Sequence, residues 1–491
     1  MPKIDDIWGL LMAAQGAWAL CAGALLCLFL DALWPKRAGT IIYAVAVATL
    51  ILSFFLTFRQ WLDPALVPGQ NLLVVDRLTL FLMFIVSAIG IITLLNAATF
   101  LRIHNGITSE FCTLILFSVA GMVFLFASDH LIVNFIGLEI MSLAIYALVG
   151  SHKKNLKSSE AAIKYFLMGS VASAVLLYGI AIFYGGFGTF KISELAIQVA
   201  NPELAYLRNM AVGLLLVGIF FKLAIVPFHF WAPDVYEGAP APVTGFMATA
   251  VKVATFGLVI RIFLELDVLA MPQVQTLLLV CVVASLVLAN VVALVQDDVK
   301  RMLAYSSISH AGFMLLGILA GFKDGIYDAA SAEVVIFYLL GYVFTTLGAF
   351  AVLSLLTRET TEATHIGDLR GLGYRHPVLA GVFFLFMLSL LGLPGTVGFA
   401  AKYGVITLAV GNGHIGVAIL GVLMSAISAF YYLRPSVLMF FKGESDEDLV
   451  PEIPGGIYFS LCFCATAVLY LGLKPDAYLR LAKIVASALS R

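Results

Sequence analysis

Residues 218–231 read GIFFKLAIVPFHFW. This stretch is a continuous apolar run of the kind that crosses a bilayer, yet it contains Lys222 and, further along, Pro227. An ionised side chain near the middle of a bilayer costs several kcal/mol, so such residues usually line a polar pathway. Proline removes a helical hydrogen bond and interrupts the helix. The stretch therefore predicts an interrupted membrane helix whose function needs charge inside the membrane.

The composition of the whole chain also indicates a membrane protein. Of its 491 residues, 62% are hydrophobic and only 12% are charged, whereas about a quarter of the residues in soluble domains are charged. The net charge of -1 and the lack of a long basic run exclude the electrostatic footprint of a nucleic-acid-binding protein. The cysteines lack the spacing of a zinc site, a redox pair or an iron–sulfur cluster, so we interpret them as buried thiols and expect no metal in this chain.

About fourteen apolar runs follow one another along the chain, each near the roughly 20 residues that a helix needs to cross the hydrocarbon core. Their continuity favours helices over barrel strands, so the predicted fold class is all-α integral membrane. The longest connections are about 20 residues, which leaves no room for a soluble domain. The predicted spans are approximately 8–34, 40–58, 78–101, 109–127, 130–151, 158–185, 207–231, 241–264, 273–295, 299–320, 329–357, 377–410, 414–441 and 455–473.

Lysine and arginine residues are unevenly divided between the two sides of these predicted spans. Most fall in loops on one side, for example Lys157, Lys300 and Arg375, and the positive-inside rule makes that side cytoplasmic. Both termini are then predicted to face the periplasm of a bacterial cell inner membrane. Residues 477–489 have helical apolar spacing with cations nearby, which predicts a short helix lying at the interface.

Four ionisable residues lie deep inside predicted spans: Glu139, Lys222, Lys252 and Lys402. Any one of them could be a snorkelling side chain or a packing accident. Four in one chain favour a polar pathway instead. Pro394 interrupts the span before Lys402, as a proline does after Lys222, and interrupted helices at mid-membrane expose backbone groups that can solvate ions.

Three further residues are weaker candidates. Lys164 lies near the start of its span, where it could relay protons or simply reach the interface with its long side chain. Histidine titrates near neutral pH, which makes His229 and His310 suitable for proton relay. A lone histidine in a helix is at least as often a hydrogen-bonded core residue, so both interpretations stay open.

Four segments are similar to the proton-translocating NADH dehydrogenase and cation antiporter family: 220–254 (FFKLAIVPFHFWAPDVYEGAPAPVTGFMATAVKVA), 297–317 (DDVKRMLAYSSISHAGFMLLG), 157–189 (KSSEAAIKYFLMGSVASAVLLYGIAIFYGGFGT) and 390–405 (LLGLPGTVGFAAKYGV). The similarity extends over essentially the whole chain. Within that family the chain most resembles the subunit N group of respiratory complex I. Lys402 stands where the subunit M group typically has glutamate, and the chain is too short for the long lateral helix of the subunit L group.

The resemblance implies about fourteen transmembrane helices with two inverted five-helix repeats and broken helices 7 and 12. It also implies four parts. These are an N-terminal three-helix segment (1–108), a first antiporter-like half (109–264), a second antiporter-like half (273–441), and a final span with a short interfacial helix (455–491).

Position by position, the resemblance implies that Glu139 and Lys222 form the ion pair of the first half. Lys252 then corresponds to the central lysine, and Lys402 to the lysine of the second broken helix. Three residues match less certain positions along the same polar axis: His229, Lys164 and His310. NADH, FMN, iron–sulfur clusters and quinone are expected in partner subunits, and no redox site is expected in this chain. The expected partners are the antiporter-like subunit M, the small subunits J, K and A, and the lipid bilayer.

Our hypothesis for the mechanism is that charge movement set off by quinone reduction elsewhere makes and breaks the Glu139–Lys222 pair. At an effective dielectric constant of about 20 and a separation of about 6 Å, the attraction is roughly 3 kcal/mol. Separating the pair would favour proton release from Lys222. Lys252 would then pass the proton laterally, and Lys402 would deliver it toward the periplasm.

Two other interpretations use the same residues. A subunit of a multisubunit Na+/H+ antiporter would use these lysines without any redox partner. A purely structural membrane spacer would explain the helices but would leave four deep charges without a purpose.

Overall fold

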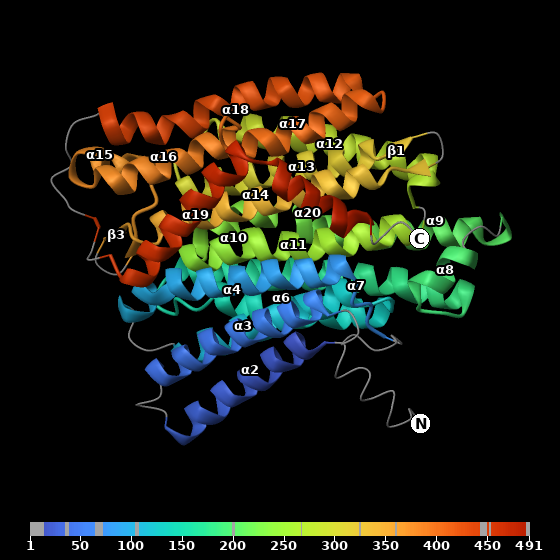
Figure 1. Ribbon diagram of the computed structural model, residues 1–491, viewed down its shortest axis with the longest axis horizontal. Helices are drawn as coiled ribbons and strands as arrows, with labels where there is room; N and C mark the ends of the chain where they lie inside the picture. Colours follow the sequence, from blue (N-terminus) through green and yellow to red (C-terminus); the bar gives the residue numbers. More distant parts are fainter. Residues whose placement is uncertain are drawn as a thin grey trace.

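The computed structural model describes residues 14–34, 39–63, 72–103, 108–198, 202–266, 268–323, 326–358, 361–441, 449–450 and 453–487. The helices run side by side along the long axis of the molecule, with α2 (Gln15–Leu33) and α3 (Gly39–Leu62) at one edge and α18 (Ile415–Phe441) at the opposite edge (Figure 1). Both ends of the chain, and the first residues of the predicted span 8–34, lie outside the described residues.

Within the described residues, 13 helices are long and apolar enough to cross a membrane. The chain is therefore a multi-pass membrane protein. Besides α2, α3 and α18, these helices are α4 (Arg77–Ile103), α5 (Thr108–Ala127), α6 (Leu131–Val149), α7 (Leu156–Phe187), α9 (Ala205–Leu223), α11 (Ala241–Glu265), α12 (Pro272–Ala293), α13 (Val299–Ala320), α14 (Ala329–Leu353) and α19 (Gly455–Leu473).

The predicted span 377–410 is divided into two shorter apolar helices, α16 (Pro377–Leu391) and α17 (Val397–Gly411). Together they make the fourteenth span, so the all-α membrane fold is confirmed. Gly392 and Gly395 have φ of +92° and +91°, a backbone conformation that glycine adopts without strain and that ends α16. The break therefore falls where the proline and glycine cluster predicted it.

The predicted span 207–231 is interrupted in a similar way. α9 ends at Leu223, and a turn containing Pro227 leads to the short helix α10 (Trp231–Gly238). In the series α5, α6, α7, α9–α10, α11, the interrupted helix is the fourth member. In the series α12, α13, α14, α16–α17, α18, the interrupted helix is again the fourth member.

The remaining described elements are short. The helix predicted at 477–489 is present as α20 (Asp476–Ser487), which packs against α14, and residues 488–489 lie outside the described residues. Two antiparallel hairpins pair β1 (Phe322–Lys323) with β2 (Ile326–Tyr327) and β3 (Thr357–Arg358) with β4 (Thr361–Glu362). The others are α8 (Ile192–Gln198), α15 (Leu372–Arg375), η2 (Pro202–Leu204), η3 (Val268–Ala270) and η4 (Ile366–Leu369).

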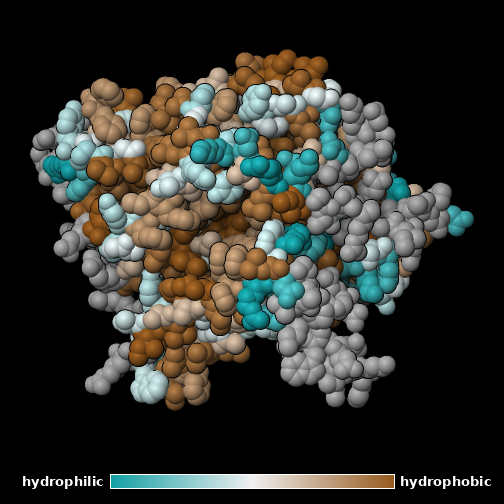
Figure 2. Space-filling view, viewed as in Figure 1, coloured by the Kyte–Doolittle hydropathy of each residue, from teal (hydrophilic) through white to brown (hydrophobic). Residues whose placement is uncertain are grey.

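The helix α11 lies at the centre of the bundle. Its most apolar stretch is entirely buried, and α4, α5, α9, α13 and α14 pack around it. By contrast, α2, α3, α18 and α19 keep most of their apolar residues on the outside. Brown, apolar side chains cover much of the face shown in Figure 2, as expected for a surface that contacts lipid.

The loops that carry most of the predicted positive charge meet at one end of the bundle. Lys157 pairs with Glu237 across 2.8 Å, and Lys300 pairs with Glu362 across 2.7 Å. One interpretation from the sequence was wrong in part. Cys462 is exposed on the outside of α19, and Cys21 is only half-buried, because the helices at the edge turn apolar side chains toward lipid rather than toward a protein core.

Candidate functional site

Lys222 lies in the last turn of α9, just before the break, and its side chain is buried. The ammonium donates hydrogen bonds to the hydroxyl of Ser142 at 2.7 Å and to the hydroxyl of Tyr146 at 3.0 Å, both on α6. It also lies 5.2 Å from the centre of the Tyr146 ring. α9 ends here because Ala224 adopts a left-handed conformation with φ of +56°. The ammonium is thus held by hydroxyl groups and an aromatic face.

Glu139 lies on α6, one turn before Ser142 and two turns before Tyr146. Residues at this spacing share one face of a helix, so Glu139 is on the face that Lys222 contacts. No ion pair joins Glu139 and Lys222 among the described residues, and the buried Oε1 atom of Glu139 has no hydrogen-bond partner there. In this structure the implied ion pair is open.

Lys252 lies in the middle of α11 and is buried. Its ammonium donates to the backbone oxygen of Ser307 on α13 at 2.9 Å and reaches the backbone oxygen of Leu223 at 3.5 Å. Leu223 directly follows Lys222 and is the last residue of α9. Carbonyls at the end of a helix lack helical partners, which makes them ready acceptors for a cation. The break after α9 therefore brings Lys252 next to the position of Lys222.

A cluster of hydroxyl groups continues from Lys252 through α13. The hydroxyl of Ser307 contacts the hydroxyls of Tyr236 at 3.2 Å and Tyr342 at 3.0 Å. One turn further along α13, His310 is buried, with its Nδ1 atom 2.7 Å from the hydroxyl of Tyr338 and its Nε2 atom 3.2 Å from the hydroxyl of Tyr432. Each hydroxyl can donate and accept a hydrogen bond, so such a cluster can pass protons.

Lys402 lies in α17, in the second half of the interrupted span, and is buried. Its ammonium donates to the backbone oxygens of Leu390 and Leu391 at 2.9 Å each, at the end of α16. It also lies 5.3 Å from the centre of the Phe313 ring on α13. Lys402 therefore binds to the carbonyl end of a broken helix, where the helix dipole favours a cation.

The order along the centre of the bundle is Lys222, Lys252, His310 and Lys402. Lys222 and Lys252 meet at the end of α9. Lys252 contacts the backbone of α13 at Ser307, and His310 lies one turn further along α13 in the hydroxyl cluster. Phe313, which lies next to Lys402, stacks at 6.4 Å on the same Tyr338 that binds His310. The two interruptions thus connect one buried polar line, named here the lysine line. Its lysines, its histidine and its hydroxyl groups can each hold or exchange a proton, and the Phe313 ring lies between Tyr338 and Lys402.

A family model described as "NADH:quinone oxidoreductase/Mrp antiporter, TM" matches residues 128–428, which is more than half of the chain and includes every residue of the lysine line. The chain belongs to this family. Its relatives include proteins named NADH-quinone oxidoreductase subunit N. The one from Halorhodospira halophila is 38% identical over 91% of this chain and 92% of its own length, and the one from Azoarcus sp. is 38% identical over 90% and 91%.

Solved structures of the family show the same fold. A chain of respiratory complex I from Thermus thermophilus with bound aureothin has a TM-score of 0.80 at 34% identity and covers 95% of this chain and 98% of its own length. A chain of the Mrp complex from Dietzia sp. has a TM-score of 0.83 over 98% and 97%. At 22% identity, this second likeness concerns the fold alone.

Two of the weaker candidates lie beside the lysine line rather than in it. Lys164 lies near the start of α7, half-exposed, and pairs with Glu160 at 2.7 Å and Asp234 at 2.9 Å. Arg301 on α13 also pairs with Asp234, at 2.7 Å, which ties α7, α10 and α13 together. His229 is buried in the turn between α9 and α10, and its Nδ1 atom has no partner among the described residues.

The residues that sequence reasoning missed are chiefly hydroxyl-bearing partners of the lysines. Ser142 and Tyr146 could have been found from their spacing, because they follow Glu139 on one face of α6. Ser306, Ser307 and His310 are close together in the segment YSSISH, which is unusually polar for a buried membrane helix. Tyr338, Tyr342 and Tyr432 gave no comparable signal, since tyrosine is common in membrane helices.

Proposed function

We propose that this chain is the antiporter-like subunit N of an NADH-quinone oxidoreductase and translocates protons along the lysine line. The observation that supports this most is that three lysines are buried in the bundle on hydroxyl groups and helix-end carbonyls. Buried charges in proteins are usually paired with opposite charges. None of these three ammonium groups contacts a carboxylate within the described part of the chain.

The chemical consequence is that each lysine can change its protonation state without leaving a carboxylate unpaired. A carbonyl accepts a hydrogen bond from an ammonium and equally from a neutral amine, and a hydroxyl can also donate one back. A lysine held by a close carboxylate would instead be stabilised in its charged form by several kcal/mol. The arrangement suits a group that must bind and release a proton in each cycle.

Glu139 is the control element in this proposal, because this half-buried residue, with a buried Oε1 atom, is the carboxylate on the face of α6 that Lys222 contacts. With the pair open, the proton on Lys222 is free to move toward Lys252. His310 and its tyrosines then relay the proton to Lys402, and His229 and Lys164 belong to the entry side. The parts of the chain in this scheme are 1–108, the halves 109–264 and 273–441, and 455–491.

The redox reaction belongs to other chains in this proposal. NADH, FMN, iron–sulfur clusters and quinone are held by partner subunits, and this chain docks with subunits M, J, K and A in the bacterial inner membrane. Both termini face the periplasm, since the loops richest in lysine and arginine face the cytoplasm.

The test is proton translocation by the purified assembly in liposomes, with electron transfer to quinone followed in the same sample. Lys222→Ala should lower the number of protons moved per quinone reduced, whereas Lys153→Ala, on an exposed loop, should leave it unchanged. Full translocation by Lys222→Ala would contradict the assignment, as would equal losses in both variants.

The same residues would serve a Na+/H+ antiporter, and the description of the matching family model, which names the Mrp antiporter as well, keeps this as a second candidate. An antiporter subunit would be purified without quinone-binding or iron–sulfur subunits, and its transport would need sodium. Copurification with redox subunits, and translocation in sodium-free buffer, would exclude it.

A further inference from the structure

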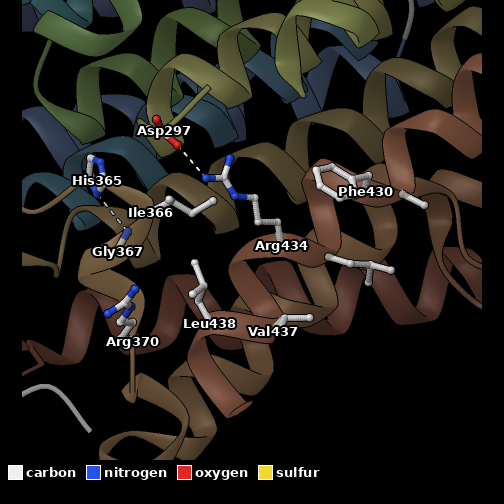
Figure 3. Close-up of a pocket in the computed structure, with 11 residues that line it drawn as sticks. Asp297, His365, Ile366, Gly367, Arg370, Phe430, Arg434, Val437 and Leu438 are labelled. Atoms are coloured by element: carbon white, nitrogen blue, oxygen red, sulfur yellow. Dashed lines mark hydrogen bonds and ion pairs between the residues drawn. The ribbon is translucent and has the colours of Figure 1, made fainter. Parts of the chain in front are cut away.

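A cleft of about 640 Å³ opens between α18 and the loop that precedes α15, and no lysine of the lysine line contributes to its walls (Figure 3). The loop contributes His365 and Arg370, and α18 contributes Phe430, Arg434 and Val437. It lies at the end of the bundle where the positively charged loops meet, because Arg434 is joined to Asp297 between α12 and α13.

The cleft has an excess of positive charge. Arg434 donates to Asp297 at 2.7 Å and to the backbone oxygen of Gln296 at 3.0 Å, so these two charges offset each other. Arg370 is exposed, and its guanidinium makes no ion pair or side-chain hydrogen bond with any described residue. His365 uses its Nδ1 atom to accept from the backbone of Gly367 at 3.1 Å. Arg370 thus lies beside the cleft without a counter-charge among the residues that the structure describes.

The other wall is apolar and faces outward. Phe430 and Val437 are 63% and 45% exposed, and with Leu433 between them they follow one face of α18. Most of the apolar stretch of α18 is unburied, as expected for a helix that contacts lipid. A cation therefore lies at the loop end of the cleft, and an apolar track leads from it along a membrane helix.

We propose that this cleft binds a phospholipid with an anionic headgroup, with the phosphate on Arg370 and an acyl chain along Phe430 and Val437. The order of groups, a cation at the membrane surface followed by an apolar track toward the middle, matches the order of groups in a phospholipid. Basic pockets between membrane helices are known to take such headgroups. An apolar helix of another protein would leave the charge of Arg370 unpaired. This inference rests on the membrane fold and is independent of the proposed proton pathway.

The experiment uses the full chain, purified in detergent with the subunits that accompany it. The probes are phosphatidylglycerol and phosphatidylcholine, each with a photoactivatable group on one acyl chain, and labelled peptides are identified by mass spectrometry. Phosphatidylglycerol should label the α18 peptide that contains Phe430 and Val437 about fivefold more than phosphatidylcholine, which corresponds to about 1 kcal/mol for one basic side chain near an anionic lipid.

Arg370→Gln should abolish this preference, Arg370→Lys should keep it, and Lys153→Gln, on another exposed loop, should not change it. Arg370 has no side-chain partner in the described part of the chain whose loss would unfold the loop, and the lysine variant reports separately on charge. Equal labelling of α18 by the two lipids would overturn the proposal. So would the absence of lipid label together with photo-crosslinking of α18 to a neighbouring subunit, which would show that a protein covers the cleft.

Discussion

Adding one methyl group at Gly398 should disable Lys402 without altering any ionisable residue. Gly398 is in the first turn of α17 and packs directly on the end of α16. A Cβ atom there would lie 1.7 Å from the backbone oxygen of Ser389, although real Cβ contacts are essentially never under 3.0 Å. Backbone atoms cannot rotate away as a flexible side chain can. Gly398→Ala must therefore move α17 away from α16 by more than 1 Å.

The displacement acts directly on Lys402, because its ammonium bridges the two helices. Its hydrogen bonds to Leu390 and Leu391 are 2.9 Å each, and an added 1 Å takes both out of hydrogen-bonding range. Hydrogen bonds to charged groups contribute about 1.5–3 kcal/mol each. A misplacement of about 1 Å at a reacting group can slow a step by about a hundredfold. We therefore expect proton translocation to fall by one to two orders of magnitude.

The assay is proton uptake by the liposome-reconstituted assembly, compared with Gly411→Ala as the matched control. Gly411 is in the same helix, and a Cβ atom there would meet nothing within 4 Å. The control should assemble and translocate protons like the unmodified protein. If Gly398→Ala assembles and translocates at the normal rate, the packing of α17 on α16 does not position Lys402 for function, and the reasoning fails.

Three further predictions follow from other contacts. Tyr146→Phe removes one of the two hydroxyls that hold Lys222, so proton translocation should fall about tenfold. Gly169→Ala, whose Cβ would lie 1.9 Å from that hydroxyl and 2.7 Å from the ring carbon Cζ, should displace the Tyr146 side chain and lower translocation as well. Arg261 is buried and paired with Asp76 at 3.1 Å. Arg261→Ala should lower the stability by about 3 kcal/mol, because it leaves Asp76 without its partner, and Arg261→Lys should lower it less. Both effects should appear as a lower thermal unfolding temperature. The hydroxyl of Thr189 and the ammonium of Lys191 hold the pKa of Glu194, in α8, below its usual value of 4.5. The contribution of the ionised Glu194 to the stability of α8 should therefore be constant at neutral pH and be lost only as the pH falls through that lowered pKa. The measurement is hydrogen exchange of α8, corrected for the intrinsic rate at each pH.

The membrane fold could be predicted because its signal is local in the sequence. A helix satisfies its own backbone hydrogen bonds, so the length of each apolar run fixes a span without knowledge of its neighbours. The two breaks could also be predicted, since Pro227 and the glycines around Pro394 act on their own segments. The short helix α10 after the first break could not be, because the apolar pattern continues through Trp231 without a marker.

The partners of the charged residues could not be predicted from local patterns. Lys222 and Tyr146 are 76 positions apart, and His310 and Tyr432 are 122 apart, so only helix packing brings them together. Arg261 was missed for the same reason, because its partner Asp76 lies 185 positions away. The sequence could identify which side chains are too polar for lipid, but the choice of partner is a property of the packed bundle.

The open Glu139–Lys222 pair gives the coupling hypothesis a specific geometry. Lys222 now binds hydroxyls one and two turns beyond Glu139 on the same face of α6. A shift of the ammonium by one helical turn, about 5.4 Å, would replace a hydroxyl partner with a carboxylate. At an effective dielectric constant of about 20, that exchange changes the energy of the charged lysine by roughly 3–4 kcal/mol, enough to reverse its preference for holding or releasing a proton. Because α9 ends one residue after Lys222, we expect this shift to move the broken end of the helix, together with the Leu223 carbonyl that Lys252 contacts, while the buried α11 stays fixed.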